Sequence, residues 1–292
     1  MAQSTGSSPR TIVAFDDSAP SATALEWAVA RERLRHGTVE VVHVVDDIAI
    51  DANQSEIERL VFDARRGAEA AVDTVRQSVP EVSILVELRR GDPEVELRGL
   101  SVPESLLVVG THQRAGRERR FGWSLGSRLA ATAKGPVAIV PELPLETTRS
   151  GVVVGVNGSA GSISAARFAA REALLREERL DVVLAWEDPG LGSGVRGLNP
   201  EFAQWLLESN SEMLDEALAL LAKEFPGLFI TGHLENEPAT PTLLAYGKRA
   251  SLLVVGTRGH GALRRFLLGS VSHGLVLGIT GPMIVVGHEG AV

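Results

Sequence analysis

The 292-residue sequence contains no cysteine, few aromatic side chains and no excess of positive charge. The lack of cysteine excludes disulfide bonds, thiolate zinc sites, iron–sulfur clusters and thiol nucleophiles. Lys and Arg number 29 against 37 Asp and Glu, which gives a formal net charge of −8. An acidic chain lacks the basic surface with which proteins bind nucleic acids or anionic membranes, so we expect neither as a partner.

Long apolar runs are also lacking. No segment approaches the roughly 18 apolar residues of a membrane-spanning helix, and residues 1–10 contain no apolar core of a signal peptide. We therefore expect a cytoplasmic protein. Hydrophobic residues make up 44% and charged residues 23% of the chain, which is typical of a folded globular protein. At roughly 150 residues per domain, the length predicts about two domains.

Three pairs of segments match in the same order in the two halves of the chain. They are TIVAFDDS (11–18) with VVVGVNGS (152–159), LLVVGTHQ (106–113) with LLVVGTRG (252–259), and GPVAIVP (135–141) with GPMIVVG (281–287). The first pair is 141 residues apart and the other two are 146 residues apart. The matches indicate a tandem duplication. We expect one domain over 1–146 and a second over 147–292.

Strand-like and helix-like patterns alternate in both halves. Strands are expected near 11–16, 39–45, 83–89, 105–110, 137–140, 151–156, 180–186, 228–234, 251–256 and 282–286. Helices are expected near 21–35, 55–78, 93–100, 124–133, 162–178, 201–224, 239–249 and 270–279. The alternation predicts an α/β fold in which each half forms a doubly wound, five-stranded parallel sheet flanked by helices. We also expect Ser21 and Ser162 to cap the first helix of each half.

The loop after the fourth strand of the second half is rich in glycine. It reads GTRGHGALRRFLLGSVS (256–272), with the spacing Gly256-x2-Gly259-x9-Gly269-Ser270 before a helix. Glycines let backbone amides approach an anion, and a helix that starts near Ser270 presents free N–H groups. Sheets of this kind bind ligands beyond the carboxyl ends of their strands. The loop therefore favours a phosphate site, although an ordinary strand–helix connection would also account for its glycines.

This glycine spacing, together with the DDS and NGS clusters after the first strands, resembles the universal stress protein family in its tandem form. The resemblance covers about residues 11–287 and implies a Rossmann-like fold of the adenine nucleotide α-hydrolase type. It implies ATP as ligand, with Mg²⁺ or Mn²⁺ at the phosphates, and a role in the stress response. It also implies pairing of the two last strands, 137–140 and 283–286, within one chain, and a homodimer of whole chains would fit the same pattern.

The family's binding positions can be carried over residue by residue. In the second half the nucleoside and phosphate positions become Gly155, Val156, Asn157, Ala185, Gly256, Gly259, Gly269, Ser270 and Val271. In the first half the counterparts are Asp16, Val44, Gly110 and Ser124. Asn157 departs from the family, which usually has Asp there; an amide can still accept a hydrogen bond and can also donate one. The family's G-x-P, intact at residues 91–93, reads Asn-Glu-Pro at 236–238.

The first-half phosphate loop, GTHQRAGRERRFGWSLGSRL (110–129), departs more strongly. Ungapped alignment places Gln113 at the position of Gly259 and Trp123 at the position of Gly269. A Trp would fill space that a phosphate needs, so we expect the nucleotide mainly in the second half. A shifted alignment through Gly116, Gly126 and Ser127 needs a three-residue insertion. The four arginines within 114–120 are consistent with a solvated loop, an altered anion site or a contact with an acidic subunit.

No catalytic constellation accompanies these loops. His112, His260 and His273 lack a nucleophile and an orienting carboxylate, and we assign no catalytic or metal-ligating residue. The sequence favours an ATP-binding regulatory protein with little or no turnover. The alternatives are a slow ATPase or nucleotide hydrolase at the same site, and a nucleotide-free protein-interaction module.

Overall fold

The computed structural model describes residues 10–46, 54–112, 124–142, 148–187, 200–257 and 268–287. The chain divides into two compact units, residues 1–144 and 145–291. The expected boundary between residues 146 and 147 lies outside the described residues.

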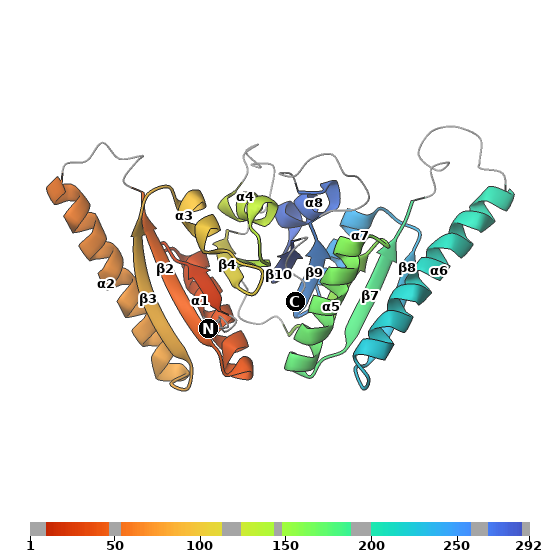
Figure 1. The fold of residues 1–292 in the computed structure, drawn as a ribbon, viewed down its shortest axis with the longest axis horizontal. Coiled ribbons are helices and arrows are strands. Elements are labelled where there is room, and N and C mark those ends of the chain that lie inside the picture. The colour runs from red at the N-terminus through yellow and green to blue at the C-terminus, as the bar shows by residue number, and fades with distance from the viewer. Residues whose placement is uncertain are drawn as a thin grey trace, which may run out of the picture. The chain divides into compact units, whose positions relative to one another are not determined.

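Unit 1 alternates strands and helices from its first strand to its last (Figure 1). Its elements are β1 (Thr11–Ala14), α1 (Ala19–Arg35), β2 (Thr38–Val45), α2 (Gln54–Ser78), β3 (Ser83–Arg90), α3 (Pro93–Leu100), β4 (Leu106–Thr111), α4 (Leu125–Thr132) and β5 (Val137–Pro141). The strands are parallel, in the order β3-β2-β1-β4-β5. This order places β1, the first strand, in the centre of the sheet.

Unit 2 repeats this arrangement. Its elements are β6 (Val152–Val156), α5 (Ala160–Arg176), β7 (Leu180–Ala185), α6 (Pro200–Glu224), β8 (Ile230–Glu235), α7 (Ala239–Gly247), β9 (Leu252–Gly256), α8 (Ser270–Gly278) and β10 (Met283–Val286). The parallel order is β10-β9-β6-β7-β8. The expected fold class is therefore confirmed for both units.

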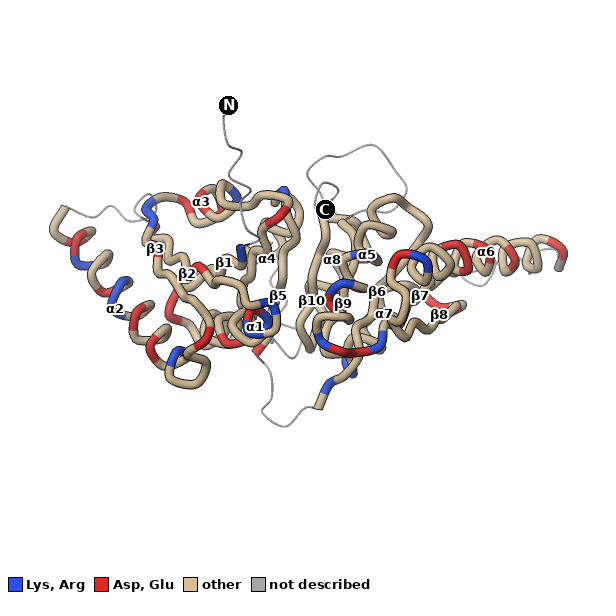
Figure 2. The backbone as a smooth tube through the Cα atoms, turned by 60° about the horizontal axis from the view of Figure 1, so that its bottom comes forward, with Lys and Arg blue, Asp and Glu red and all other residues tan. Residues whose placement is uncertain are grey.

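Helices pack in pairs on each sheet (Figure 2). In unit 1, α1 lies beside α2 and α3 beside α4; in unit 2, α5 lies beside α6 and α7 beside α8. The central strands are buried along most of their length, as in Leu106–Val109 and Leu252–Val255. Continuous apolar runs are what parallel strands need when helices cover both faces of the sheet. The side chains of these strands therefore belong to the core of each unit.

The first helix of each unit begins earlier than expected. Its N-cap is Ser18 in α1 and Ser159 in α5, and each cap oxygen accepts a hydrogen bond from a backbone amide three residues later. The expectation that Ser21 and Ser162 are the caps is therefore wrong. Both lie in the first helical turn, and their hydroxyls donate to the cap carbonyls. An S-x-x-S spacing offers two serines, and the earlier one has the extended backbone that a cap requires.

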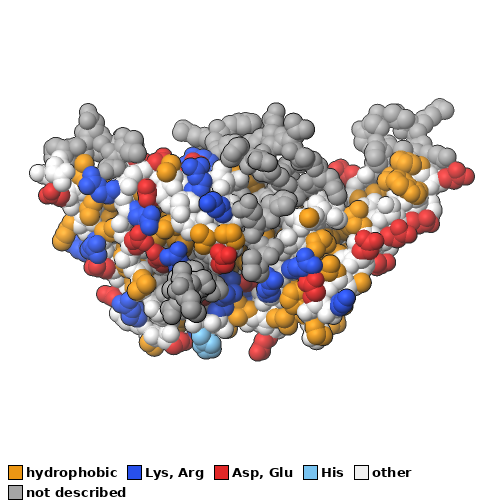
Figure 3. Space-filling view, viewed as in Figure 1, with side chains coloured by type: hydrophobic (Ala, Val, Ile, Leu, Met, Phe, Trp, Pro, Cys, Tyr) orange, Lys and Arg blue, Asp and Glu red, His pale blue; other side chains and the backbone are white. Residues whose placement is uncertain are grey.

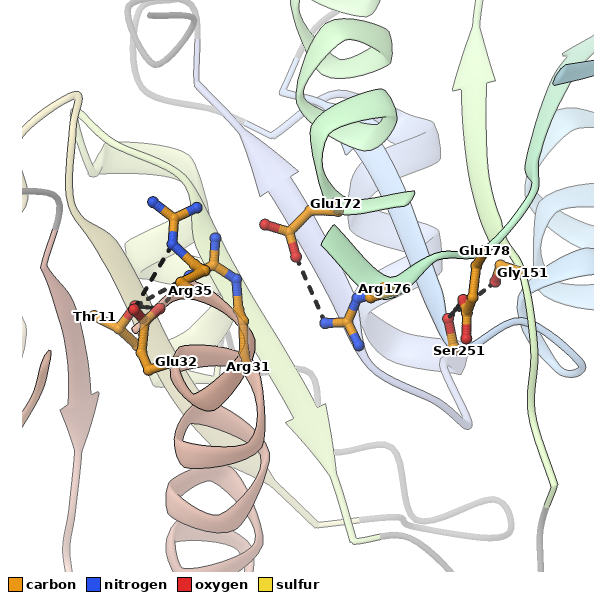
Figure 4. Close-up of polar contacts among 9 residues, drawn as sticks. All are labelled: Thr11, Arg31, Glu32, Arg35, Gly151, Glu172, Arg176, Glu178 and Ser251. Carbon is orange, nitrogen blue, oxygen red and sulfur yellow. Dashed lines mark hydrogen bonds and ion pairs between the residues drawn. The ribbon is translucent and has the colours of Figure 1, made fainter. Parts of the chain in front are cut away.

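Charged side chains are buried in the last turns of α1 and α5 (Figure 4). In α1, a nitrogen of Arg31 lies 2.6 Å from a carboxylate oxygen of Glu32, which also accepts a hydrogen bond from Thr11 at 2.6 Å. In α5, Glu172 pairs with Arg176 at 3.5 Å. Both clusters lie near the amino ends of the strands, at the opposite edge from the candidate site. The free-energy cost of burying these charges is offset only while both partners of each pair are present. We therefore assign the two clusters a role in stability.

Candidate functional site

The candidate residues lie at the carboxyl edges of the two sheets, where the strand order reverses. In unit 2 the chain runs from β6 outward to β7 and β8, then returns to β9 and β10 on the other side of β6. The carboxyl ends of β6 and β9 therefore form the switch point at which open α/β sheets bind ligands. The ends of β1 and β4 form the equivalent place in unit 1.

Asn157 follows β6 directly and builds the loop that starts α5. Its Oδ1 accepts hydrogen bonds from the backbone amide of Ser159 at 3.2 Å and from the Ser159 hydroxyl at 2.7 Å. The backbone amide of Asn157 donates to the Ser162 hydroxyl at 3.3 Å. Since Ser159 in turn caps α5, the amide side chain fixes the start of that helix.

Asp16 makes the same loop in unit 1. Its Oδ1 accepts from the amide and the hydroxyl of Ser18, and its own amide donates to Ser21. Because both loops use Oδ1 alone for these bonds, exchanging Asp for Asn preserves the loop. The difference is confined to the second terminal atom, an acceptor oxygen in Asp16 and a donor nitrogen in Asn157.

Unit 1 also carries a histidine near this loop. Burial raises the pKa of Asp16. Hydrogen bonds from Ser18 and Ser21 and the charge of His43 lower it, and their combined effect is larger, so the pKa of Asp16 lies below its ordinary value. Burial lowers the pKa of His43, although Asp16 and Asp17 oppose this effect. The corresponding position in unit 2 is Leu184. The two switch points therefore differ in the groups that can take up a proton.

A glycine lies at the end of β9 and one residue before the end of β4 for a reason of packing. A Cβ at Gly110 would lie 2.2 Å from the carbonyl oxygen of Pro20, and a Cβ at Gly256 would lie 2.8 Å from that of Gly161. The first turn of α1 or α5 thus rests on the end of the neighbouring strand. In unit 2 this contact holds the Asn157 loop next to the end of β9. It also explains why residue 256 is a glycine, without invoking a bound anion.

The start of α8 is tied to the end of β9. The amide of Gly269 donates to the carbonyl of Thr257 at 2.9 Å, and the Ser272 hydroxyl donates to the carbonyl of Gly256 at 2.8 Å. Gly269 is the N-cap, and no side chain caps the helix. Ser270 is exposed and Val271 is half-buried. The expected phosphate positions Gly256, Gly269, Ser270 and Val271 are therefore brought together beside Asn157.

Helix α4 begins differently. Ser124, which aligns with Ser270, lies outside the helix as its N-cap, and its hydroxyl accepts from the amide of Ser127 at 3.2 Å. The two hydroxyls lie 3.0 Å apart. Of the four helices that begin at the switch points, all within the described residues, α8 alone starts without a side-chain cap. Ser124 thus occupies its own helix terminus, whereas the amides of α8 have no such cap.

The remaining nucleoside positions contribute backbone or small side chains. Val156 is buried, and Gly155 is half-buried, with the space of its absent side chain filled by Leu243 of α7. Ala185 ends β7 and Val44 lies one residue before the end of β2; both are half-buried. Gly259 lies outside the described residues, as do Gln113, Trp123 and the arginines at 114–120.

One exchange between the units was missed by sequence reasoning. Asp17 has a positive φ of 62° and packs against Gly67 of α2, where a Cβ would lie 3.0 Å from its carboxylate. In unit 2 the same loop position is Gly158, with φ 73°, and Met213 of α6 fills the space beside it. The sequence contains a signal for this exchange. Gly67 and Met213 are 146 residues apart and therefore equivalent, and from unit 1 to unit 2 this position becomes larger while Asp17 is replaced by the smaller Gly158.

The described residues contain neither a membrane-spanning helix nor a cluster of metal-binding side chains. Within them, no helix combines the length and apolar character needed to cross a membrane. The same residues contain no group of three or more His, Asp or Glu side chains placed to hold a metal ion. Among the described residues of unit 2, those at the switch point offer backbone amides, hydroxyls and the amide side chain of Asn157.

The fold and its switch-point loops define a tandem pair of doubly wound α/β domains. A profile of the Universal stress protein family matches residues 9–141 and 149–287, so the chain belongs to that family. The recognised resemblance is thereby confirmed over both halves.

Curated relatives carry the same family name. Universal stress protein Rv1996 of Mycobacterium tuberculosis is 29% identical over 297 residues, covering 94% of this chain and 93% of its own. A universal stress protein of Mycolicibacterium smegmatis is 27% identical, covering 94% and 96%. A universal stress protein structure from Archaeoglobus fulgidus superposes with a TM-score of 0.70 at 19% identity, covering 97% of this chain and 99% of that one. At that identity the superposition supports the fold alone.

Proposed function

We propose that the chain is an ATP-binding regulatory protein of the stress response and that unit 2 holds the nucleotide. The observation that carries the proposal is the start of α8. Its first-turn amides have no side-chain cap, and two hydrogen bonds hold it against the end of β9. Uncapped amides at the positive end of a helix dipole favour phosphate oxygens. The exposed Ser270 hydroxyl adds a further donor.

The nucleoside would lie over the carboxyl ends of β6 and β7. There Gly155, Val156 and Ala185 lie at or near the carboxyl ends of the two strands, and the small side chain of Ala185 would face the base. Asn157 offers a terminal donor where the family usually has an acceptor, and a ribose hydroxyl can meet either. We therefore expect Asn157 to be compatible with nucleotide binding.

Unit 1 is proposed to act mainly as a scaffold. Its Asp16 loop is intact, but Ser124 caps α4 and thereby uses the terminus that would receive phosphate. The phosphate loop itself contains Gln113 and Trp123 in place of two family glycines. One intact switch point and one self-capped switch point predict a single nucleotide per chain.

A divalent ion would arrive with the nucleotide. The described donors at the start of α8 are amides and hydroxyls, which are poor cages for a resident Mg²⁺ or Mn²⁺. Phosphate oxygens and water would therefore supply most ligands of the ion. From the family resemblance we further propose pairing of the last strands and a homodimer. We also propose a cytoplasmic location, because the sequence has no signal-like apolar core, and little turnover, because no catalytic constellation accompanies the loops.

Nucleotide occupancy would act through stability. A ligand that binds only the folded state adds RT ln(1 + [L]/Kd), about 2.7 kcal/mol at one hundred times Kd. Thermal melts with and without Mg-ATP should therefore show stabilisation that Gly269→Trp removes. Ser124→Ala, which changes the N-cap of the equivalent helix in unit 1, should retain it. Equal melts for the unmodified chain would favour the interaction module. Hydrolysis clearly above background and lost in Gly269→Trp would favour the slow ATPase.

A further inference from the structure

The first half of α6 presents aromatic side chains to solvent. The buried residues of this helix are Leu214, Ala217 and Leu221, and none between 201 and 213 is buried. Phe202 and Trp205 are 42% and 56% exposed, and their rings stack with centroids 5.6 Å apart. In Figure 3, hydrophobic side chains gather at the upper end of α6, with acidic side chains along its outer edge. Large stacked aromatics at a solvent-facing surface are typical of binding sites.

Acidic residues flank the exposed tryptophan on one stripe of the helix. Glu201, Trp205, Glu208 and Glu212 follow one another at spacings of four, three and four, which places them on the same helical face. All four are exposed. In the part of the chain that the structure describes, no Lys or Arg forms an ion pair with Glu208 or Glu212. The stripe therefore combines a flat aromatic surface with negative charge.

The whole helix shares this sign. Its 25 residues include six acidic side chains and one basic side chain, Lys223 (Figure 2). At the far end, Glu224 forms a bidentate pair with Arg167. A charge of this size on one exposed helix attracts cations and repels other acidic surfaces.

The corresponding helix of unit 1 lacks the feature. α2 also has 25 residues and leaves its first half unburied, but it mixes five acidic with four basic side chains. Its charges pair along the helix, as in Arg65 with Glu69 and Arg76 with Asp73. The acidic aromatic stripe is thus not a requirement of the fold, because α2 fills the same structural role without it.

We propose that Phe202, Trp205 and the carboxylates of Glu201, Glu208 and Glu212 form a docking surface for a cationic amphipathic segment of a partner protein. An Arg or Lys side chain would lie over the Trp205 ring, where the π-face attracts a cation, with carboxylates on either side. An apolar side chain of the partner would cover Phe202. A second copy of this chain is disfavoured as the partner because both copies carry a net charge of −8. The proposal does not depend on nucleotide binding.

The test uses the full chain and a fluorescently labelled short peptide of alternating Arg and Leu, followed by anisotropy. We expect binding that weakens as salt is raised and that an analogous Gln and Leu peptide does not show. The variant Trp205→Ala/Glu208→Gln/Glu212→Gln should weaken binding about tenfold or more. The matched α2 variant Phe62→Ala/Glu58→Gln/Asp63→Asn removes the same number of charges and one aromatic ring. It should stay within about twofold of the unmodified chain.

Three results would overturn the proposal. Equal losses in the α6 and α2 variants would show that only net charge matters, and equal binding of the uncharged peptide would show non-specific apolar adhesion. Sedimentation that reveals self-association lost only in the α6 variant, without peptide binding to the monomer, would assign the surface to a second copy. Thermal melts check that both variants fold; all six substituted side chains are exposed, so we expect unchanged melts.

Discussion

Units 1 and 2 build the loop after their first strand with the same atoms and begin their last helix with different ones. Asp16 and Asn157 each accept two hydrogen bonds from the following serine, which then caps the next helix. At the last helix, Ser124 caps α4, whereas Gly269 leaves α8 without a side-chain cap. The first loop is needed to start a core helix in either unit. The start of the last helix is the place where one unit can keep a binding site and the other can lose it.

A second contrast concerns packing. The exchange of Asp17 and Gly67 for Gly158 and Met213 moves bulk from the loop to the helix while keeping the space filled. Both loop positions are exposed and both helix positions are half-buried, and a size change at one position costs less when its neighbour changes in the opposite sense. The two units thus differ by compensating changes of side-chain size where the loop contacts the helix. They differ in charge on the solvent-facing parts of α2 and α6.

The largest expected loss of stability concerns Gly110, near the end of β4, and Gly256, at the end of β9. Gly110→Ala should destabilise unit 1 by about 3 kcal/mol or more, because its Cβ would lie 2.2 Å from backbone of α1. Gly256→Ala should cost unit 2 less, about 2 kcal/mol, since the equivalent approach is 2.8 Å. Hydrogen exchange of the β4 and β9 amides reports the two units separately. A larger loss for Gly256→Ala would mean that helix contact does not explain these glycines.

The exchanged pair predicts a smaller effect. Gly158→Asp should destabilise unit 2 by about 1 kcal/mol, because φ there is 73° and the flexible side chain of Met213, whose sulfur lies 2.6 Å from the added Cβ, must move. Adding Met213→Gly recreates the arrangement of unit 1 and should recover at least about 1 kcal/mol relative to additive behaviour. A double-mutant cycle on denaturant unfolding measures this coupling. Strict additivity would show that the two positions do not compensate each other.

Much of the fold could be predicted because buried parallel strands leave an unambiguous pattern. The helix expected over 93–100 is α3 (Pro93–Leu100), and the strand expected near 11–16 is β1 (Thr11–Ala14). The error at the helix caps arose because Ser18 and Ser21 are both suitable residues, and only the backbone conformation distinguishes them. Local sequence does not carry that information.

Packing, rather than a ligand, accounts for one of the predicted site residues. Gly256 was interpreted as space for an anion, whereas its Cβ is excluded by the first turn of α5. That contact joins residues about 95 positions apart, so no local pattern reveals it. The self-capping of α4 by Ser124 was likewise hidden, because the alignment with Ser270 suggested an equivalent role. Whether the serine caps the helix or lies within it depends on a shift of one residue in the start of the helix.

The central claim is that one of the two switch points holds a nucleotide. The most direct measurement is to denature the purified chain and determine by mass spectrometry which nucleotide is released and how much per chain. We predict about one ATP per chain, retained in Ser124→Ala and lost in Gly269→Trp. Two nucleotides per chain, or one that survives Gly269→Trp, would contradict the assignment of the site to the uncapped start of α8.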